Sequence, residues 1–154
     1  MTKEVIVPEK STIERARKDQ REGKAPSTQA GEFVREEMDH IREGKHGARS
    51  ARQAIAIGLS KARRAGVKLP PPKKARTSGR IRKQAKRELA KGKSRGKPSK
   101  TRSRAAKRRL KREPRSAASH LALSRQAHRA ARSRTKASRS RAAKKAARTR
   151  QKRR

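Results

Sequence analysis

Lysine and arginine are the side chains whose number and spacing most clearly suggest a chemistry, and that chemistry is the neutralisation of phosphate groups. Residues 44–154 hold 42 of the 51 bases but only two of the 12 acids, a net charge of +40. A polyanion is the expected partner of such a segment. The candidate nucleic-acid contacts are Lys73, Lys74, Arg76, Arg80, Arg82, Lys83, Lys86, Arg87, Arg102, Arg104, Lys107, Arg108, Arg109, Lys111, Arg112, Arg125, Arg129, Arg132, Arg134, Lys136, Arg139, Arg141, Lys144, Lys145, Arg148, Arg150, Lys152, Arg153 and Arg154.

Aromatic side chains are almost absent, and this bears on which nucleic acid is bound. Modules that read RNA sequence usually stack bases on aromatic rings, but the chain has no Trp or Tyr and a single Phe, Phe33. Duplex DNA can be bound without sequence preference through backbone contacts alone. We therefore expect double-stranded DNA as the partner, with RNA as the alternative.

Two short motifs resemble known sites but lack essential parts. Gly92-Lys93-Ser94 resembles the end of a phosphate-binding loop, yet Arg87 stands where that loop needs its first glycine, and no strand precedes it. Glu37 and His40 have the Glu-x-x-His spacing of di-iron helical bundles, which need two such motifs. We expect the pair to lie on a solvated helix face.

The remaining histidines, His46, His120 and His128, have no obvious partners in the sequence and are expected to contact phosphate or solvent. No nucleophile–base pair is recognisable. The sequence therefore predicts neither an enzyme nor a bound metal or cofactor.

Large apolar residues are too few for an extensive core. Leu, Ile, Val and Phe total 17 of 154 residues, and chains so poor in them and so highly charged rarely fold throughout. There is no Cys for disulfides, no apolar run long enough to span a bilayer, and no signal-peptide stretch in residues 1–10. We expect a cytoplasmic, nucleoid-located protein without membrane contact.

Three helices are predicted in the first 69 residues. The first covers residues 12–22 after a capping box of Ser11 and Glu14. The second begins at residues 26–28, and the third follows a second capping box of Ser50 and Gln53. The glycines expected to end the three helices are Gly23, Gly44 and Gly66.

The predicted fold is mostly α, with a small helical hairpin or three-helix head and a long basic tail that is disordered or conditionally helical. The expected divisions are an N-terminal segment (1–25), a hairpin head (26–69), a Pro-rich linker (70–77) and a low-complexity tail (78–154). Six core side chains would make the head marginal, so it is expected to self-associate or dock on a partner. These side chains are Phe33, Val34, Met38, Ile41, Ile55 and Leu59.

Residues 36–65 resemble a family of short, basic bacterial proteins of unknown function. The resemblance rests on a helix ending in a Gly-Lys turn, a Ser/Arg-rich cap and the run Gln-Ala-Ile-Ala-Ile-Gly-Leu-Ser at residues 53–60. It implies an uncharacterised domain, sometimes described as DNA-binding or plasmid-stabilising, with no catalytic residues. The family pattern often has Ala at the position of Gly58, which implies a weaker helix here.

The chain after residue 72 resembles, in composition, the tails of bacterial histone H1-like proteins. This resemblance implies a nucleoid-associated role in which DNA is compacted without sequence reading. Two alternatives stay open at this point: an RNA- or ribosome-associated basic structural protein, and an accessory module for plasmid or phage DNA maintenance.

Overall fold

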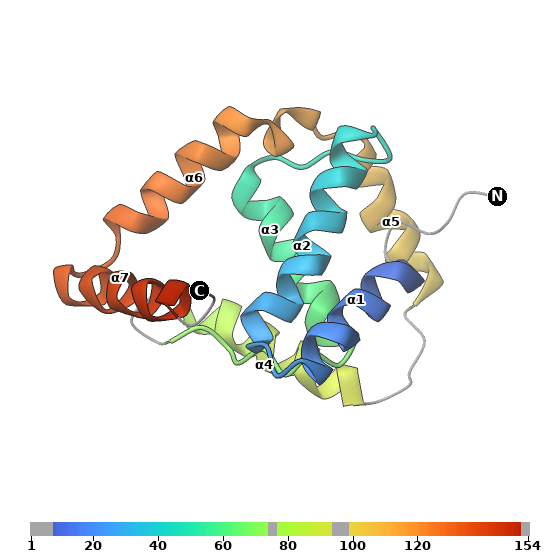
Figure 1. Ribbon diagram of the computed structural model, residues 1–154. Coiled ribbons are helices and arrows are strands. Elements are labelled where there is room, and N and C mark those ends of the chain that lie inside the picture. Colours follow the sequence, from blue (N-terminus) through green and yellow to red (C-terminus); the bar gives the residue numbers. More distant parts are fainter. Residues whose placement is uncertain (1–7, 74–76, 94–98, 152–154) are drawn as a thin grey trace. The chain divides into compact units, whose positions relative to one another are not determined.

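The computed structural model describes residues 8–73, 77–93 and 99–151. Those residues form seven α-helices and one short 3-10 helix, with no strand among them (Figure 1). The predicted mostly helical fold is therefore confirmed. The chain divides into two compact units, Met1–Ser119 and His120–Arg154, and each is described by itself.

Helices α1 (Lys10–Arg21) and α2 (Pro26–Arg42) open the first unit. Helix α2 begins at Pro26 as predicted. Proline is favourable at a helix start, because the N–H that it lacks would have no partner in the first turn. The capping box predicted at Ser11 is wrong, since α1 begins at Lys10 and its cap residue Glu9 makes no side-chain cap hydrogen bond. The Glu9 N–H instead donates to Glu36 Oε2 at 3.2 Å, so a tertiary contact with α2 fixes the start of α1.

Helix α3 (Ala51–Arg64) has the cap that its sequence predicts. Ser50 Oγ accepts a hydrogen bond from the Gln53 N–H at 3.2 Å, and Gln53 Oε1 accepts one from the Arg49 N–H at 2.8 Å. The return bond thus reaches one residue further back than in a standard capping box. The expected glycine ends are confirmed at all three helices, where the chain turns through a positive φ.

Helix α4 (Gly79–Lys93) packs against α3, although it falls within the predicted basic tail. Glu88 of α4 is buried and accepts a hydrogen bond from Ser60 Oγ at 2.7 Å. It also pairs with Arg63 at 3.3 Å. One of the two tail acids therefore joins α4 to α3.

A second segment of the predicted tail also packs against α2 and α3. Helix α5 (Lys100–Lys111) and the 3-10 helix η2 (Arg115–Ala118) follow α4. The carbonyls of Leu110 and Pro114 accept hydrogen bonds from Gly47 and Ala48, at 2.9 and 3.0 Å. The short segment 110–118 therefore lies along the loop that joins α2 to α3.

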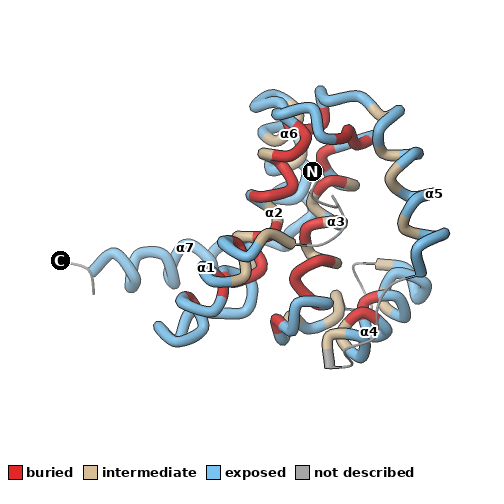
Figure 2. Tube along the Cα trace, turned by 90° about the vertical axis from the view of Figure 1, so that its right-hand side faces the viewer, coloured by how far each residue is buried: buried red, intermediate tan, exposed pale blue. Residues whose placement is uncertain are grey.

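The core between α1, α2 and α3 is built largely from small residues. Buried residues recur along α2 and α3 (Figure 2). One cluster joins Phe33 and Val67 to alanines of all three helices. Of the predicted core side chains, Phe33, Met38 and Ile41 are buried, whereas Val34, Ile55 and Leu59 are half-buried.

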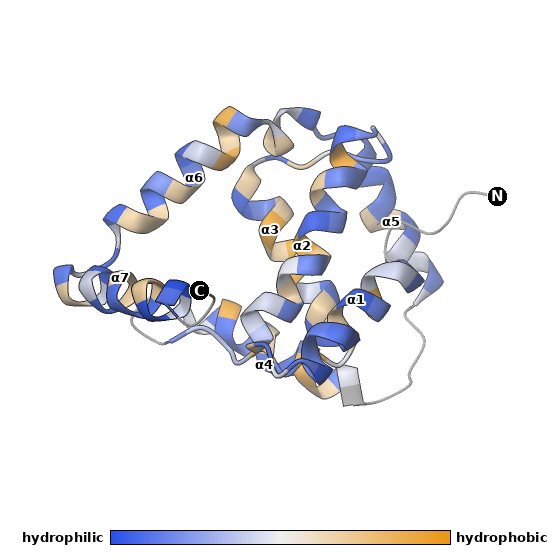
Figure 3. Ribbon diagram, in the orientation of Figure 1, coloured by the Kyte–Doolittle hydropathy of each residue, from blue (hydrophilic) through white to orange (hydrophobic). Residues whose placement is uncertain are grey.

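The second unit comprises α6 (His120–Arg132) and α7 (Lys136–Gln151), neither of which has a buried residue. Leu121 is 60% exposed, and hydrophilic side chains occur along the length of α7 (Figure 3). Disorder of this segment in the unbound protein stays a prediction, as do the division between head and tail and the linker at residues 70–77.

Candidate nucleic-acid interface

The predicted phosphate contacts lie on α4 to α7 and the segments beside these helices. Among those that the structure describes, all are exposed except Arg82 and Lys107, which are half-buried. Arg82 Nε donates to the Pro72 carbonyl at 3.1 Å. Five of the predicted contacts lie outside the described residues: Lys74, Arg76, Lys152, Arg153 and Arg154.

Helix α5 carries the densest basic surface of the first unit. Arg108, Arg109 and Arg112 line a shallow hollow together with Ala105 and Glu113. No residue of α5 is buried. Three guanidinium groups, each with several N–H donors, can therefore reach an external phosphate from this side.

Helix α7 has a charge spacing that suits a nucleic-acid strand. Its 16 residues include seven bases and no acid. At 1.5 Å per residue the helix is about 24 Å long, or roughly one positive charge per 3.4 Å. Each strand of duplex DNA carries one phosphate charge per about 3.4 Å of helix axis, which is a similar linear charge density.

The bases of α5, α6 and α7 have no acidic partner within the part of the chain that the structure describes. Ion pairs join bases and acids of the first 63 positions to one another, and Arg63–Glu88 connects α3 to α4. Exposed cations without internal counter-charges leave the basic surface available to an external polyanion.

The first unit also contains a cluster of polar side chains that are buried in its interior. Glu36 and Glu37 of α2 and Lys61 of α3 are each no more than 5% exposed. Lys61 Nζ lies 2.8 Å from Glu37 Oε2 and 3.5 Å from Glu36 Oε1. We call these three residues, with His40 and His46, the polar cluster.

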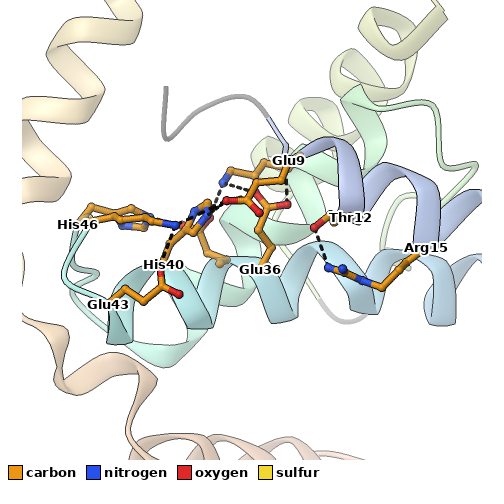
Figure 4. A network of polar contacts seen from close by, with 10 residues as sticks. Glu9, Thr12, Arg15, Glu36, His40, Glu43 and His46 are labelled. Atoms are coloured by element: carbon orange, nitrogen blue, oxygen red, sulfur yellow. Dashed lines mark hydrogen bonds and ion pairs between the residues drawn. The ribbon is translucent and has the colours of Figure 1, made fainter. Parts of the chain in front are cut away.

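Two imidazole rings complete the polar cluster (Figure 4). His40 Nε2 lies 3.1 Å from Glu9 Oε1, and His46 Nε2 lies 3.2 Å from Glu37 Oε1. The rings meet edge to face with centroids 6.2 Å apart. The hydrogen bond from His40 lowers the pKa of the Glu9 carboxyl, partial burial opposes this, and the nearby charge of Lys45 lowers the pKa further.

The polar cluster corrects two expectations from the sequence. Glu37 and His40 do not lie on a solvated face, since they are 0% and 5% exposed, and His46 is 2% exposed rather than open to solvent or phosphate. The apolar stripe of α2 predicts which apolar residues are buried, but it gives no sign that the neighbouring polar residues Glu37 and His40 are buried as well. A second His just after the Gly-Lys turn was the available signal.

Residues 9–74 match a family of unknown function, DUF6496. The DUF6496 match spans α1, α2, α3 and the whole polar cluster, whereas α4 to α7 lie beyond it. Comparison with curated proteins and with solved structures found no match.

Within the residues that the structure describes, no helix is long and apolar enough to cross a membrane.

Proposed function

We propose that the protein binds double-stranded DNA without reading its sequence, through the exposed bases of α4 to α7, and compacts it as a histone-like nucleoid protein. The observation that carries the proposal is the lack of internal acidic partners for the exposed bases of α5 to α7 among the described residues. A segment of this charge gains free energy when phosphates replace its own counterions.

Two features favour duplex DNA over RNA. The single aromatic residue, Phe33, is 1% exposed and packs in the core, so it cannot stack on a base. Readers of single-stranded RNA depend largely on such stacking. The basic helices instead offer a dense run of exposed positive charge, and contacts to the phosphate backbone are enough for sequence-tolerant duplex binding.

The compositional resemblance of residues after position 72 to histone H1-like tails agrees with this role. In this proposal the basic helices supply the affinity, and the DUF6496 region orients them or binds a further partner. The basic helices are then expected to retain most of the DNA affinity of the full chain.

A salt titration of binding to random-sequence duplex DNA tests the proposal. If ten phosphates are contacted, raising the salt from 50 to 200 mM should weaken binding by roughly 10⁵-fold. A shallow salt dependence, or strong preference for one DNA sequence, would contradict the proposal. Tighter binding to an RNA fragment of equal length would transfer the function to RNA.

A pair of charge variants separates the local surface from total charge. Replacing four bases of α7 with Gln (Arg139, Arg141, Lys144 and Lys145) should weaken binding and make its salt dependence shallower. The matched control removes four exposed bases from α1, where acids are interspersed: Lys10, Arg17, Lys18 and Arg21. Equal losses from both variants would show that only net charge matters.

A further inference from the structure

We infer that the polar cluster is a binding site for a divalent transition-metal ion such as Zn²⁺, with Glu37, His40 and His46 as ligands. One donor atom of each of these three buried residues lies within 4.8 Å of the donors of the other two. Imidazole and carboxylate together suit Zn²⁺ and its neighbours in the first transition row, whereas Mg²⁺ and Ca²⁺ prefer oxygen ligands alone.

Both imidazole rings are oriented as metal-binding histidines usually are. His40 Nε2 faces the Glu9 carboxylate and His46 Nδ1 faces the Gly47 carbonyl at 3.0 Å. Because these oxygens can only accept, each of those nitrogens carries the hydrogen. The other nitrogens, His40 Nδ1 and His46 Nε2, are left as acceptors inside the cluster. Such an outer hydrogen bond fixes the ring and its tautomer in most metal sites.

The inward-facing atoms lack hydrogen bonds although they are buried. His40 Nδ1, His46 Nε2 and Glu37 Oε1 have none, whereas Glu37 Oε2 is paired with Lys61 Nζ at 2.8 Å. The side chains of Glu37 and His46 are 0% exposed. Unpaired buried polar groups are costly and therefore rare. A metal ion bound by these lone pairs would satisfy them.

The spacing of His46 and Glu37 also fits a shared ion. Their facing atoms are 3.2 Å apart without a hydrogen bond between them. Two ligands of a tetrahedral zinc ion, each bound at about 2.0–2.1 Å, are separated by about 3.3 Å. His40 would need to move closer to bind the same ion.

Charge balance points the same way. With neutral rings, the two carboxylates and the single ammonium of Lys61 leave this buried group with one uncompensated negative charge. A divalent cation would change this net charge from −1 to +1, and the Glu9 carboxylate beside His40 would offset the remainder. Glu36 Oε1, 4.0 Å from His40 Nδ1, would complete the ligand set only by moving closer. Lys61, 2.8 Å from Glu37 Oε2, would hold the second oxygen of a ligating carboxylate as an outer partner.

The site joins α2 to the loop before α3, so the ion would be structural. Unfolded chain cannot present these ligands together, and binding therefore stabilises the fold. The inference is independent of the proposed DNA binding, since the site lies inside the DUF6496 region and not on the basic surface.

The test uses the full-length protein without an affinity tag, stripped of metal by a chelator. Titration with Co²⁺ should give the intense visible bands of four-coordinate cobalt, which Zn²⁺ then removes, and Zn²⁺ should raise Tm. Weak six-coordinate bands, or no rise in Tm with Zn²⁺, would overturn the site and leave a metal-free network of charged groups.

Variants locate the ion. His46→Gln should abolish the cobalt bands, whereas His120→Gln and His128→Gln, matched changes at exposed positions of α6, should leave them unchanged. Glu9→Gln keeps all ligands but weakens the outer contact to His40, and metal affinity should fall roughly 10–100-fold. If His46→Gln does not fold, the Glu9 variant still decides: undiminished affinity there, or loss of the bands in the α6 variants, overturns the assignment.

Discussion

Gly58 of α3 lies at a close approach of α3 to α2, and its replacement tests how the two helices pack. A Cβ added there would lie 2.7 Å from Val34 Cα and 3.0 Å from the Phe33 carbonyl oxygen. Real Cβ atoms do not approach backbone so closely, and backbone atoms cannot rotate away. Gly58→Ala would therefore force α2 and α3 apart.

Two opposing effects set the size of the change. Alanine gains about 1 kcal/mol in helix propensity over glycine, while overpacking a fitted interface costs about 1–3 kcal/mol. We expect a net destabilisation of roughly 1 kcal/mol, which lowers Tm by about 4–8 °C in a unit of this size.

Gly31 provides a matched control on the facing helix. It is exposed on α2, and an added Cβ would meet nothing within 4 Å. Gly31→Ala should therefore stabilise the protein by roughly 0.5–1 kcal/mol. Thermal unfolding followed by circular dichroism measures both variants, and a Tm that rises equally in the two would refute the close packing at Gly58.

Three further predictions concern the contacts around this core. Glu88→Gln leaves the buried Arg63 without its ion partner and should destabilise the first unit by about 3–5 kcal/mol in urea unfolding, whereas the exposed Glu14→Gln should change little. Gly47→Ala would place a Cβ against the Glu113 carbonyl. Amide hydrogen exchange at positions 47 and 48 should become faster, because their hydrogen bonds to segment 110–118 would break. Unchanged protection would show that this segment is not held there. The hydrogen bond and charge of Lys24 lower the pKa of Glu22, so Lys24→Met should raise that pKa in an NMR titration. Because the pKa of Glu22 is lowered in the folded protein, this pair stabilises the fold above the unfolded pKa, and the stabilisation is lost as the pH falls through the folded pKa. A difference in stability between the original protein and the Lys24 variant that persists in acid would contradict this account.

The helices could be predicted from sequence because their ends depend on local chemistry. Gly23, Gly44 and Gly66 adopt positive φ values, and the Ser50 cap needs only a residue three positions later. The start of α1 could not be predicted, because it depends on Glu36, 27 residues further along. Local signals identify an element, whereas a tertiary contact can move its end.

The polar cluster and the packing of segment 110–118 were hidden from sequence reasoning for different reasons. Composition assigns Glu37 and Lys61 to the surface because isolated buried charges are costly, and only the fold shows that they pair. Segment 110–118 docks through backbone hydrogen bonds to Gly47 and Ala48 and through the buried Ala117 and Ala118. Alanine recurs throughout the basic segment, so the sequence does not single out these two.

The two parts of the chain use their charges in opposite ways, and this difference links the structure to the proposed function. In the DUF6496 region, acids such as Glu36, Glu37 and Asp19 are already paired with bases from the same region. They are therefore not available to neutralise the exposed bases of α5 to α7, which have no acid of their own among the described residues. Because neither part supplies the missing negative charge, we propose that an external polyphosphate compensates the basic helices without disrupting the core.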